Sequence, residues 1–314
     1  MKRIITLLCT VVLLVSFVGC SSTSDATIDS YTEGLHTTLS NSTLFDLSDE
    51  TEALTSALTS ALTSEDTQAD QPLAPAKTKV AIFTDPHSAL IDTKVNTRHP
   101  SLSPVKIKKM MDKFVRMGVE YVICLGDFIE NAYDDEENTE MLEMMMGIIR
   151  TYDVKFYTLM GNHDCDAFTK EEFYEIAGID SVPRAEKVGD ALFVYLDANF
   201  LADGTSYAPG NIDWTSTRIP QDQLDFFRRA WQSTDAEEVY VFMHQNVDTT
   251  IPNEKYWLSN AEQVQSVFAE CPKLKGVYQG HYHKGNTSVI DGITYTTIPA
   301  VCEGENMPYI ILEV

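Results

Sequence analysis

Basic residues are scarce in this sequence. Its 314 residues include 23 lysines and arginines against 47 aspartates and glutamates, which gives a formal net charge of −24 at pH 7. A protein that binds long nucleic acids needs a positive surface to meet the phosphate backbone. We therefore expect no long nucleic acid among its partners, although net charge says nothing about the fold.

Cysteines with metal-binding spacing are also missing. The chain has six cysteines, and no two of them stand at the short spacing of a zinc–thiolate motif. A thiolate metal site is therefore not expected. Cys124 lies within an apolar stretch, which is typical of a buried core residue.

The apolar run at residues 4–18 is too short to span a bilayer comfortably. It follows Lys2 and Arg3, and this layout predicts a signal peptide over residues 1–19. The stretch LVSFVGC resembles the lipobox of bacterial lipoproteins, in which the cysteine is lipidated and becomes the first mature residue. The resemblance implies export and an anchor at Cys20 on the outer face of a membrane. An ordinary cleaved signal peptide with a chance cysteine is the alternative.

The composition changes between residues 21 and 78. Serine and threonine dominate there, the first basic residue is Lys77, and the tetrapeptide ALTS occurs three times at residues 53–64. Such a segment buries too little apolar surface to offset the entropy cost of ordering. We therefore predict that residues 20–78 form a lipidated cysteine and a disordered tether, with a reach of roughly 40–45 Å.

From residue 79 onward, apolar β-prone stretches alternate with helical patterns. Strands are predicted in VAIFTDPH, YVICLGDF, 155–160, 191–198, VYVFMH, GVYQGHYH, 294–298 and 309–313. Helices are predicted at 104–117, 139–151, 169–177, 221–232 and 260–270. The acidic stretch at residues 130–140 is predicted to be solvated. This alternation is consistent with an α/β fold.

The stretch KFYTLMGNHD at residues 155–164 is the most informative of the chain. Gly161 breaks its predicted strand, and Asn162, His163 and Asp164 follow at once. An amide, an imidazole and a carboxylate offer a neutral oxygen ligand, a proton carrier and an orienting anion. Taken alone, the stretch is also compatible with a polar turn that caps the next helix.

The same arrangement recurs at other predicted strand ends. The polar residues there are Asp85 and His87, Asp127, His244, and His281 with His283. Five of the seven histidines lie at strand ends of this kind. Because sites in α/β sheets gather at the carboxyl ends of strands, we expect these side chains to converge. Carboxylate, imidazole and amide donors without thiolate suit Mn, Fe or Zn, and the choice among these stays open.

This ordered set resembles the calcineurin-like metallophosphoesterase family, whose pattern is D-x-H, G-D, G-N-H-[DE], H and G-H-x-H. The corresponding blocks here are DPH, GDF, GNHD, a lone histidine and GHYH, within a catalytic domain at residues 79–314. The resemblance implies a four-layer α-β-β-α sandwich of two mixed sheets with helices outside. The segment DWTSTRIPQDQLDFF looks most like the branch of purple-acid-phosphatase-like and ADP-ribose/CDP-alcohol diphosphatase-type enzymes. Class III cyclic-nucleotide phosphodiesterases share the same blocks.

The resemblance also implies two bound metal ions. The first ion would be held by one carboxylate and two imidazoles: Asp85, His87 and His283. The second would be held by one amide and two imidazoles: Asn162, His244 and His281. Asp127 would bridge the two ions, and its charge would offset their mutual repulsion.

The implied reaction is hydrolysis of a small phosphorylated substrate by in-line attack of metal-bound hydroxide. His163 would stabilise the phosphoryl transition state or protonate the leaving group, and Asp164 would orient the His163 ring. Phosphomonoesters, phosphodiesters and nucleotide diphosphates remain open as substrates. A surface scaffold without catalysis is the competing hypothesis. Members of that kind typically lose ligands or the GNH histidine, and none is missing here.

The predicted loop at residues 199–220 is long for a compact domain, and such loops are usually functional or disordered. Tyr207 and Trp214 within it would be able to stack on a substrate ring. Packing at the rim of the domain explains them equally well.

Overall fold

The computed structural model describes residues 77–92, 97–131 and 134–314. The signal peptide, Cys20 and the tether up to residue 76 lie outside the described residues. The strands are β1 (Lys79–Phe83), β2 (Tyr121–Cys124), β3 (Lys155–Thr158), β4 (Arg184–Val188), β5 (Ala191–Tyr195), β6 (Glu238–Phe242), β7 (Leu274–Gln279), β8 (Asn286–Ile290), β9 (Ile293–Thr297) and β10 (Ile310–Glu313). The helices are α4 (Ser103–Arg116), α5 (Asp135–Ile149), α6 (Asn162–Ala167), α7 (Lys170–Ala177), α8 (Gln221–Ser233) and α9 (Ala261–Ala269), with 3-10 turns η1 (Pro100–Leu102) and η2 (Glu254–Tyr256). None of the helices in these ranges has the length and apolar content needed to cross a membrane.

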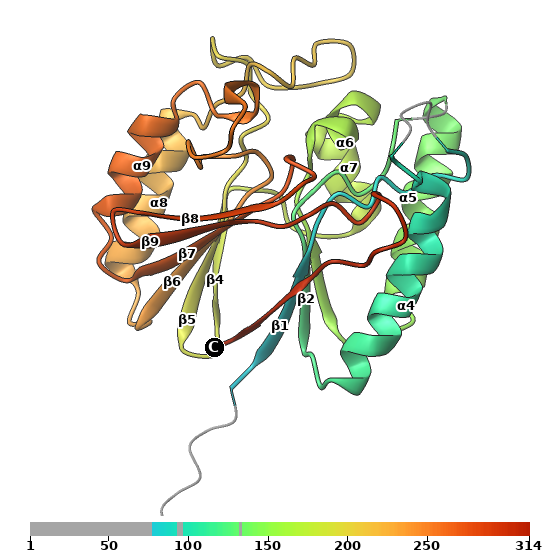
Figure 1. The fold of residues 1–314 in the computed structure, drawn as a ribbon, viewed down its shortest axis with the longest axis horizontal. Coiled ribbons are helices and arrows are strands. Elements are labelled where there is room, and N and C mark those ends of the chain that lie inside the picture. The colour runs from blue at the N-terminus through green and yellow to red at the C-terminus, as the bar shows by residue number, and fades with distance from the viewer. Residues whose placement is uncertain (1–76, 93–96, 132–133) are drawn as a thin grey trace, which may run out of the picture. The chain divides into compact units, whose positions relative to one another are not determined.

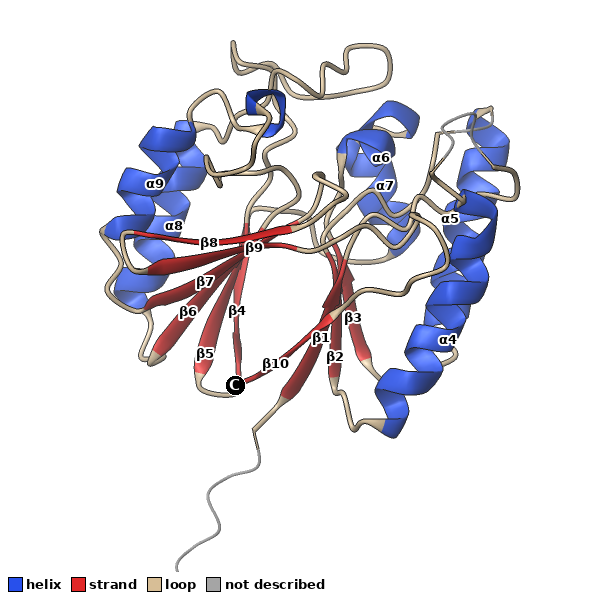
Figure 2. Ribbon diagram, in the orientation of Figure 1, coloured by secondary structure: helices blue, strands red, loops and turns tan. Residues whose placement is uncertain are grey.

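The strands form two mixed sheets that face each other between helices (Figures 1 and 2). One sheet has the order β10-β1-β2-β3 and the other β4-β5-β6-β7-β9-β8. The antiparallel pairs are β1 with β10, β4 with β5 and β8 with β9, whereas the remaining neighbours are parallel. Helices α4 and α5 cover the outer face of the first sheet, and α8 and α9 cover that of the second. This confirms the predicted four-layer sandwich.

The side chains of β1 show why two sheets stack here. Successive side chains of a strand point to opposite faces of its sheet. Val80 and Ile82 enter the apolar cluster between the two sheets, whereas Ala81 and Phe83 enter the cluster beneath α4 and α5. A further cluster lies between the six-stranded sheet and helices α8 and α9. The central strands of the two sheets therefore need apolar residues on both faces, which is why they appear in the sequence as continuous apolar runs.

Helix α5 begins earlier than its apolar pattern predicts. Asp134 caps it by accepting the backbone N–H of Glu137 at 3.0 Å. Asp135, Glu136 and Glu137 occupy the first turn, where negative charge interacts favourably with the helix dipole. Part of the acidic stretch predicted to be solvated is thus the start of a helix.

Candidate metal centre

Five strands deliver the predicted ligands to one place. Each ligand or ligand pair follows the carboxyl end of β1, β2, β3, β6 or β7 within a few residues. β1, β2 and β3 are parallel neighbours in one sheet, and β6 and β7 are parallel neighbours in the other. The predicted convergence at strand ends therefore occurs across both sheets.

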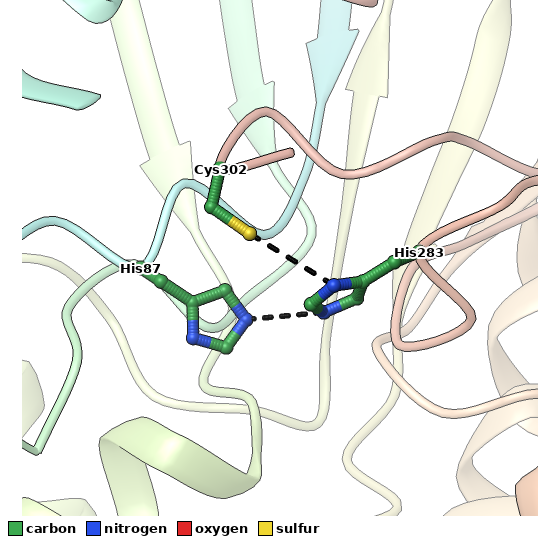
Figure 3. Close-up of side chains that lie close together, drawn as sticks. All are labelled: His87, His283 and Cys302. Carbon is green, nitrogen blue, oxygen red and sulfur yellow. Dashed lines mark hydrogen bonds between the residues drawn. The ribbon is translucent and has the colours of Figure 1, made fainter. Parts of the chain in front are cut away.

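A first group of donor atoms lies between the loops that follow β1, β2 and β7. One donor atom from each of four residues lies within 4.8 Å of the others: Asp85, His87, Asp127 and His283. His283 Nε2 is 3.2 Å from Asp85 Oδ1, and His87 Nε2 is 3.3 Å from Asp127 Oδ2. Figure 3 shows the His87 and His283 rings turned toward each other, with their Nε2 atoms 3.2 Å apart.

A second group shares Asp127 with the first. Donor atoms of Asp127, His244 and His281 lie within 4.8 Å of one another, and His244 Nε2 is 3.3 Å from Asp127 Oδ2. Asn162 opens helix α6, next to His163, whose backbone N–H donates to Asp127 Oδ1 at 2.8 Å. The Asp127 carboxylate thus stands between the two groups.

Several buried donor atoms of this centre make no hydrogen bond within the described part of the chain. They are Asp85 Oδ1, Asn162 Oδ1, His244 Nε2 and His281 Nε2. Buried polar atoms are costly to leave without a partner, so such atoms are uncommon. All four belong to the ligand set predicted from the sequence. The residues present therefore fit two bound cations.

The electrostatics of the centre also suit cations. Burial alone would raise the pKa of Asp85, but the charge of His244 and the nearby imidazoles of His283 and His87 outweigh burial and hold this pKa well below 3.8. Burial, reinforced by the neighbouring His244 charge, lowers the pKa of His281 to about 3. Asp85 is thus in the ionised form and His281 in the neutral form in which such groups bind metals. Burial alone would lower the pKa of His244, but the charges of Asp127 and Asp85 outweigh burial and raise it to about 9, so a cation that binds there displaces a proton.

Carboxylates and a carbonyl hold the far side of the histidine rings. His87 Nδ1 lies 2.8 Å from Glu130 Oε2, and His283 Nδ1 lies 2.8 Å from Glu303 Oε1. His244 Nδ1 lies 3.1 Å from the carbonyl oxygen of Leu125. Such contacts fix the orientation of each ring so that Nε2 faces the donor group.

The sequence did not predict the roles of Glu130 and Glu303. Glu130 belongs to the stretch predicted to be solvated, but only 7% of its surface is exposed. The signal available for Glu130 is its position three residues after Asp127, within GDFIE. Glu303 carries no comparable signal, because its contact with His283 depends on a loop that the sequence pattern does not place.

Glycines at the strand ends allow the ligand loops to touch. A Cβ atom on Gly161 would lie 2.1 Å from Asp127 Oδ1. A Cβ atom on Gly280 would lie 2.1 Å from Thr84 Oγ1 and 2.6 Å from Asp85 Oδ2. No side chain fits at these distances, so the glycines of GNHD and GHYH are required by close approach to neighbouring carboxylates.

The backbone of the centre is strained. Four predicted ligands have left-handed φ angles: 51° at Asp85, 45° at His87, 48° at Asp127 and 65° at His281. Each such conformation costs on the order of 1–3 kcal/mol outside glycine. Hydrogen bonds between loops hold it in place, including His87 N–H to the Asp127 carbonyl at 2.9 Å and His281 N–H to Asp85 Oδ2 at 3.0 Å. Backbone strain of this kind clusters at functional sites.

His163 stands beside both donor groups without joining either of the ligand sets predicted. Its ring packs edge-on against His87, with centroids 4.5 Å apart, and its Nδ1 lies 2.8 Å from Glu130 Oε1. A quarter of its side chain is exposed, whereas those of His87 and His244 are fully buried. This exposure leaves the ring accessible to a substrate at the centre.

Asp164 makes contacts other than the one predicted for it. Its carboxylate is fully buried and accepts backbone N–H groups of Phe128 at 3.1 Å, Ile129 at 3.0 Å and Gly161 at 2.8 Å. Burial and the charge of Asp127 raise the pKa of Asp164, and these three N–H groups oppose that rise. The expected orienting contact to His163 is made by Glu130, and Asp164 instead ties the loop after β2 to the loop after β3.

The residues that follow His244 connect the ligand loops. Gln245 Nε2 donates to Asn199 Oδ1 at 2.5 Å, and Asn199 Nδ2 donates to the Met160 carbonyl at 2.8 Å. Asn246 Nδ2 donates to the Gly280 carbonyl at 3.0 Å. The loop after β6 is thereby bonded to the loops that carry GNHD and GHYH.

Cys302 lies beside the first donor group. Its Sγ is 3.8 Å from His283 Nδ1, and these two residues with His87 form a group of donor atoms within 4.8 Å (Figure 3). Burial raises the pKa of the Cys302 thiol, and the His283 Nδ1 that faces the sulfur already pairs with Glu303. Cys302 thus stands beside His283 as a further potential donor atom, a position that the cysteine spacing of the sequence did not indicate.

Comparison with known proteins agrees with this architecture. The sequence pattern of the calcineurin-like phosphoesterase family matches residues 78–285, and the chain belongs to this family. It is 24% identical over 191 residues to a probable cyclic nucleotide phosphodiesterase of Fibrobacter succinogenes, a match that covers 58% of this chain and 64% of that protein.

Solved structures share the fold. A dimetal phosphatase from Danio rerio superposes with a TM-score of 0.67 at 17% identity, covering 76% of this chain and 93% of that one. A purple acid phosphatase from yellow lupin (Lupinus luteus) superposes with a TM-score of 0.51 at 15% identity, covering 76% of this chain and 47% of that one. At these identities the likeness is one of fold.

Proposed function

We propose that this chain is an exported phosphoesterase that hydrolyses a small phosphorylated substrate at a centre of two Mn, Fe or Zn ions. The observation that carries the proposal is the set of four buried donor atoms without hydrogen bonds, all within the predicted ligand set. The relatives that match this chain are named as phosphodiesterases and phosphatases, which supports phosphoester hydrolysis. Phosphomonoesters, phosphodiesters and nucleotide diphosphates are the substrate classes to test.

Different residues of the centre would have different roles in this reaction. Two bound cations would supply polarisation of the phosphoryl group and a water of lowered pKa. Asp127 belongs to both donor groups, and its negative charge would offset the repulsion between the two cations. His163 would present the ring nitrogen opposite its Glu130 contact to the leaving oxygen, at which it would stabilise negative charge or donate a proton.

Metal removal tests the proposal. Dialysis against a chelator is expected to abolish hydrolysis of a panel of phosphomonoesters, phosphodiesters and nucleotide diphosphates. Adding back Mn²⁺, or Fe or Zn, is expected to restore it with two ions per chain by elemental analysis. Full turnover by verified metal-free protein would contradict the two-ion centre. Two tightly bound ions with no turnover of any substrate would favour the binding scaffold.

We also propose that Cys20 carries a lipid anchor and that residues 21–78 hold the catalytic domain away from the membrane. The stretch LVSFVGC and the serine- and threonine-rich composition that follows it support this arrangement. The substrate would then be met outside the cytoplasm.

A further inference from the structure

Aromatic side chains from separate loops gather around one of the predicted metal ligands. Trp214 comes from the loop before α8, Tyr256 from η2 and Tyr282 from the loop after β7. The ring centroids of Trp214 and Tyr256 are 5.3 Å apart, and those of Tyr256 and Tyr282 are 4.9 Å apart. We call these three side chains the aromatic rim.

The aromatic rim adjoins the second donor group directly. The His281 ring lies edge-on to Trp214, with centroids 5.9 Å apart, and to Tyr256, with centroids 5.3 Å apart. His281 Nε2 is one of the buried donor atoms without a hydrogen bond. Only the width of one imidazole therefore separates the aromatic rim from the place where a phosphoester would bind.

The two aromatic residues Tyr207 and Trp214 of the long loop at residues 199–220 differ in how exposed their side chains are. Tyr207 is 1% exposed, and its hydroxyl donates to the carbonyl oxygen of Asp213 and lies 3.1 Å from that of Ser216, so it holds the loop together. Trp214 is 39% exposed, although large apolar side chains are normally buried. The sequence left substrate stacking and rim packing open for both residues, and the structure leaves Trp214 available for stacking.

We infer that the aromatic rim binds the base of a nucleoside, so that the substrate is a nucleoside phosphoester. This inference rests on the proposed phosphoesterase function. Aromatic side chains stack on any base because every base has a π-face. In a nucleotide, one sugar joins the base to the phosphate, and this short connection matches an aromatic surface that begins one ring away from the metal ligands. A phosphorylated sugar or alcohol would give the aromatic rim nothing to stack on.

The test compares two diesters with the same leaving group. Methyl p-nitrophenyl phosphate and thymidine 5′-(p-nitrophenyl phosphate) differ only in the group that remains on phosphorus. The Mn²⁺-loaded wild-type protein is expected to have the higher kcat/KM for the thymidine ester. In Trp214→Ala, the ratio of the two kcat/KM values is expected to fall by about tenfold or more, since a base–aromatic stack is lost.

Matched variants separate stacking from loop packing. Trp214→Phe retains a ring and is expected to keep most of the preference, whereas Trp231→Phe on α8 is expected to keep all of it. Equal slowing of both esters in Trp214→Ala would mean that Trp214 only packs the loop and would overturn the inference. A wild-type protein that hydrolyses both esters without preference would overturn it as well.

A binding measurement keeps this test independent of turnover. Thymidine 5′-monophosphate is expected to quench the tryptophan fluorescence of the Mn²⁺-loaded wild type and of Trp231→Phe, but much less that of Trp214→Phe. If the wild type hydrolyses neither these esters nor any member of the substrate panel named above, the phosphoesterase proposal fails, and Trp214-dependent quenching would still support the base-binding rim. Quenching that does not depend on Trp214 would overturn the rim.

Discussion

At the scale of single residues, Asp127 belongs to both predicted donor groups, whereas each ligand histidine belongs to one of them. Asp127 Oδ2 lies 3.3 Å from His87 Nε2 of the first group and 3.3 Å from His244 Nε2 of the second. We expect Asp127→Asn to lose metal at both positions, because the shared anionic donor is removed. His283→Ala is expected to lose chiefly one ion, because it belongs to the first group alone. Elemental analysis of the purified variants decides this, and two ions retained in Asp127→Asn would refute the shared role.

The contribution of His163 to the rate should depend on the leaving group of the phosphoester. Positioned proton transfer contributes on the order of 10²–10⁴ in rate. An alkyl or ribosyl oxygen needs a proton to leave, whereas nitrophenolate leaves nearly unaided. We expect His163→Ala, with both metals retained, to slow alkyl phosphate esters far more than nitrophenyl esters, as measured by kcat for each. Equal slowing of both would mean that His163 acts by stabilising charge, with water as the proton donor.

Glu130, and not Asp164, contacts the His163 ring, so Glu130 is the second residue to vary in this test. Glu130 lies 2.8 Å from His163 Nδ1, whereas Asp164 bonds three backbone N–H groups. Glu130→Gln is therefore the variant expected to reproduce the leaving-group dependence more weakly. Asp164→Asn instead disturbs the junction of two loops, so its principal effect should appear in thermal stability.

At the scale of helices and strands, β4 joins the two sheets through one side chain. Glu186 accepts hydrogen bonds from Tyr121 of β2 at 2.6 Å and from Tyr195 of β5 at 3.1 Å. Arg184 donates to the same oxygen at 3.1 Å, and Lys155 pairs with the other oxygen. Burial alone would raise the pKa of Glu186, but the hydrogen bonds from Lys155 and Tyr121 outweigh burial and lower this pKa below 4.5.

This network predicts a pH-dependent contribution to stability. Because the pKa of Glu186 is lower in the folded state, its stabilisation is complete above pH 4.5 and is lost as the pH falls through the folded-state pKa. At pH 7, Glu186→Ala is expected to lower the free energy of unfolding by about 1–3 kcal/mol, as measured in urea. The control is Glu143→Ala on the exposed face of α5. The difference in unfolding free energy between the wild type and Glu186→Ala should become smaller as the pH falls. A difference that stays the same at acidic pH would contradict the prediction.

Local sequence pattern accounts for the inner strands and for the edge strands β3 and β10 of the four-stranded sheet, but not for the edges of the six-stranded sheet. β1, β2, β5 and β6 are buried on both faces, so their apolar runs identify them. β4 and β8 are edge strands with partly exposed, polar sequences, and no strand was predicted there. Helix α6 is short and opens directly at Asn162, so the GNHD stretch serves both as a ligand loop and as a helix start.

Local sequence pattern likewise predicts the metal ligands but not the residues that support them. Histidines and carboxylates at strand ends were predictable, because strand ends are rigid and meet at one edge. Glu130, Glu303 and Asn199 act through contacts between loops, which depend on how the two sheets are placed. The positive φ angles of Asp85 and Asp127 likewise follow from cross-loop hydrogen bonds that no local pattern specifies.

At the scale of the whole molecule, the position of the centre follows from the stacking of the sheets. The four-stranded sheet supplies the DPH, GDF and GNHD loops, and the six-stranded sheet supplies His244 and the GHYH loop. Neither sheet alone holds a complete donor group, because each group draws on both. The apolar cluster between the sheets, with Tyr157 against Tyr195 at a centroid distance of 4.6 Å, therefore maintains the metal centre as well as the fold.

The domain organisation predicts how the chain divides between membrane and solution. The first described strand begins at Lys79, and all predicted ligands lie beyond it. Residues 79–314 expressed alone should therefore be soluble and active, with a kcat close to that of the full chain. In the full chain, Cys20→Ala should move the protein from the membrane fraction to the soluble fraction, because the lipid acceptor is removed.

Two controls test whether Cys20 carries the membrane anchor. Cys302→Ala removes a cysteine from the folded domain and should leave the membrane fraction unchanged, whereas mass spectrometry of the wild-type protein should find a lipid on Cys20. Retention of Cys20→Ala in membranes would show that another segment anchors the chain. Failure of residues 79–314 to fold would show that the segment before β1 packs on the domain, and the proposed tether would then be a structural element.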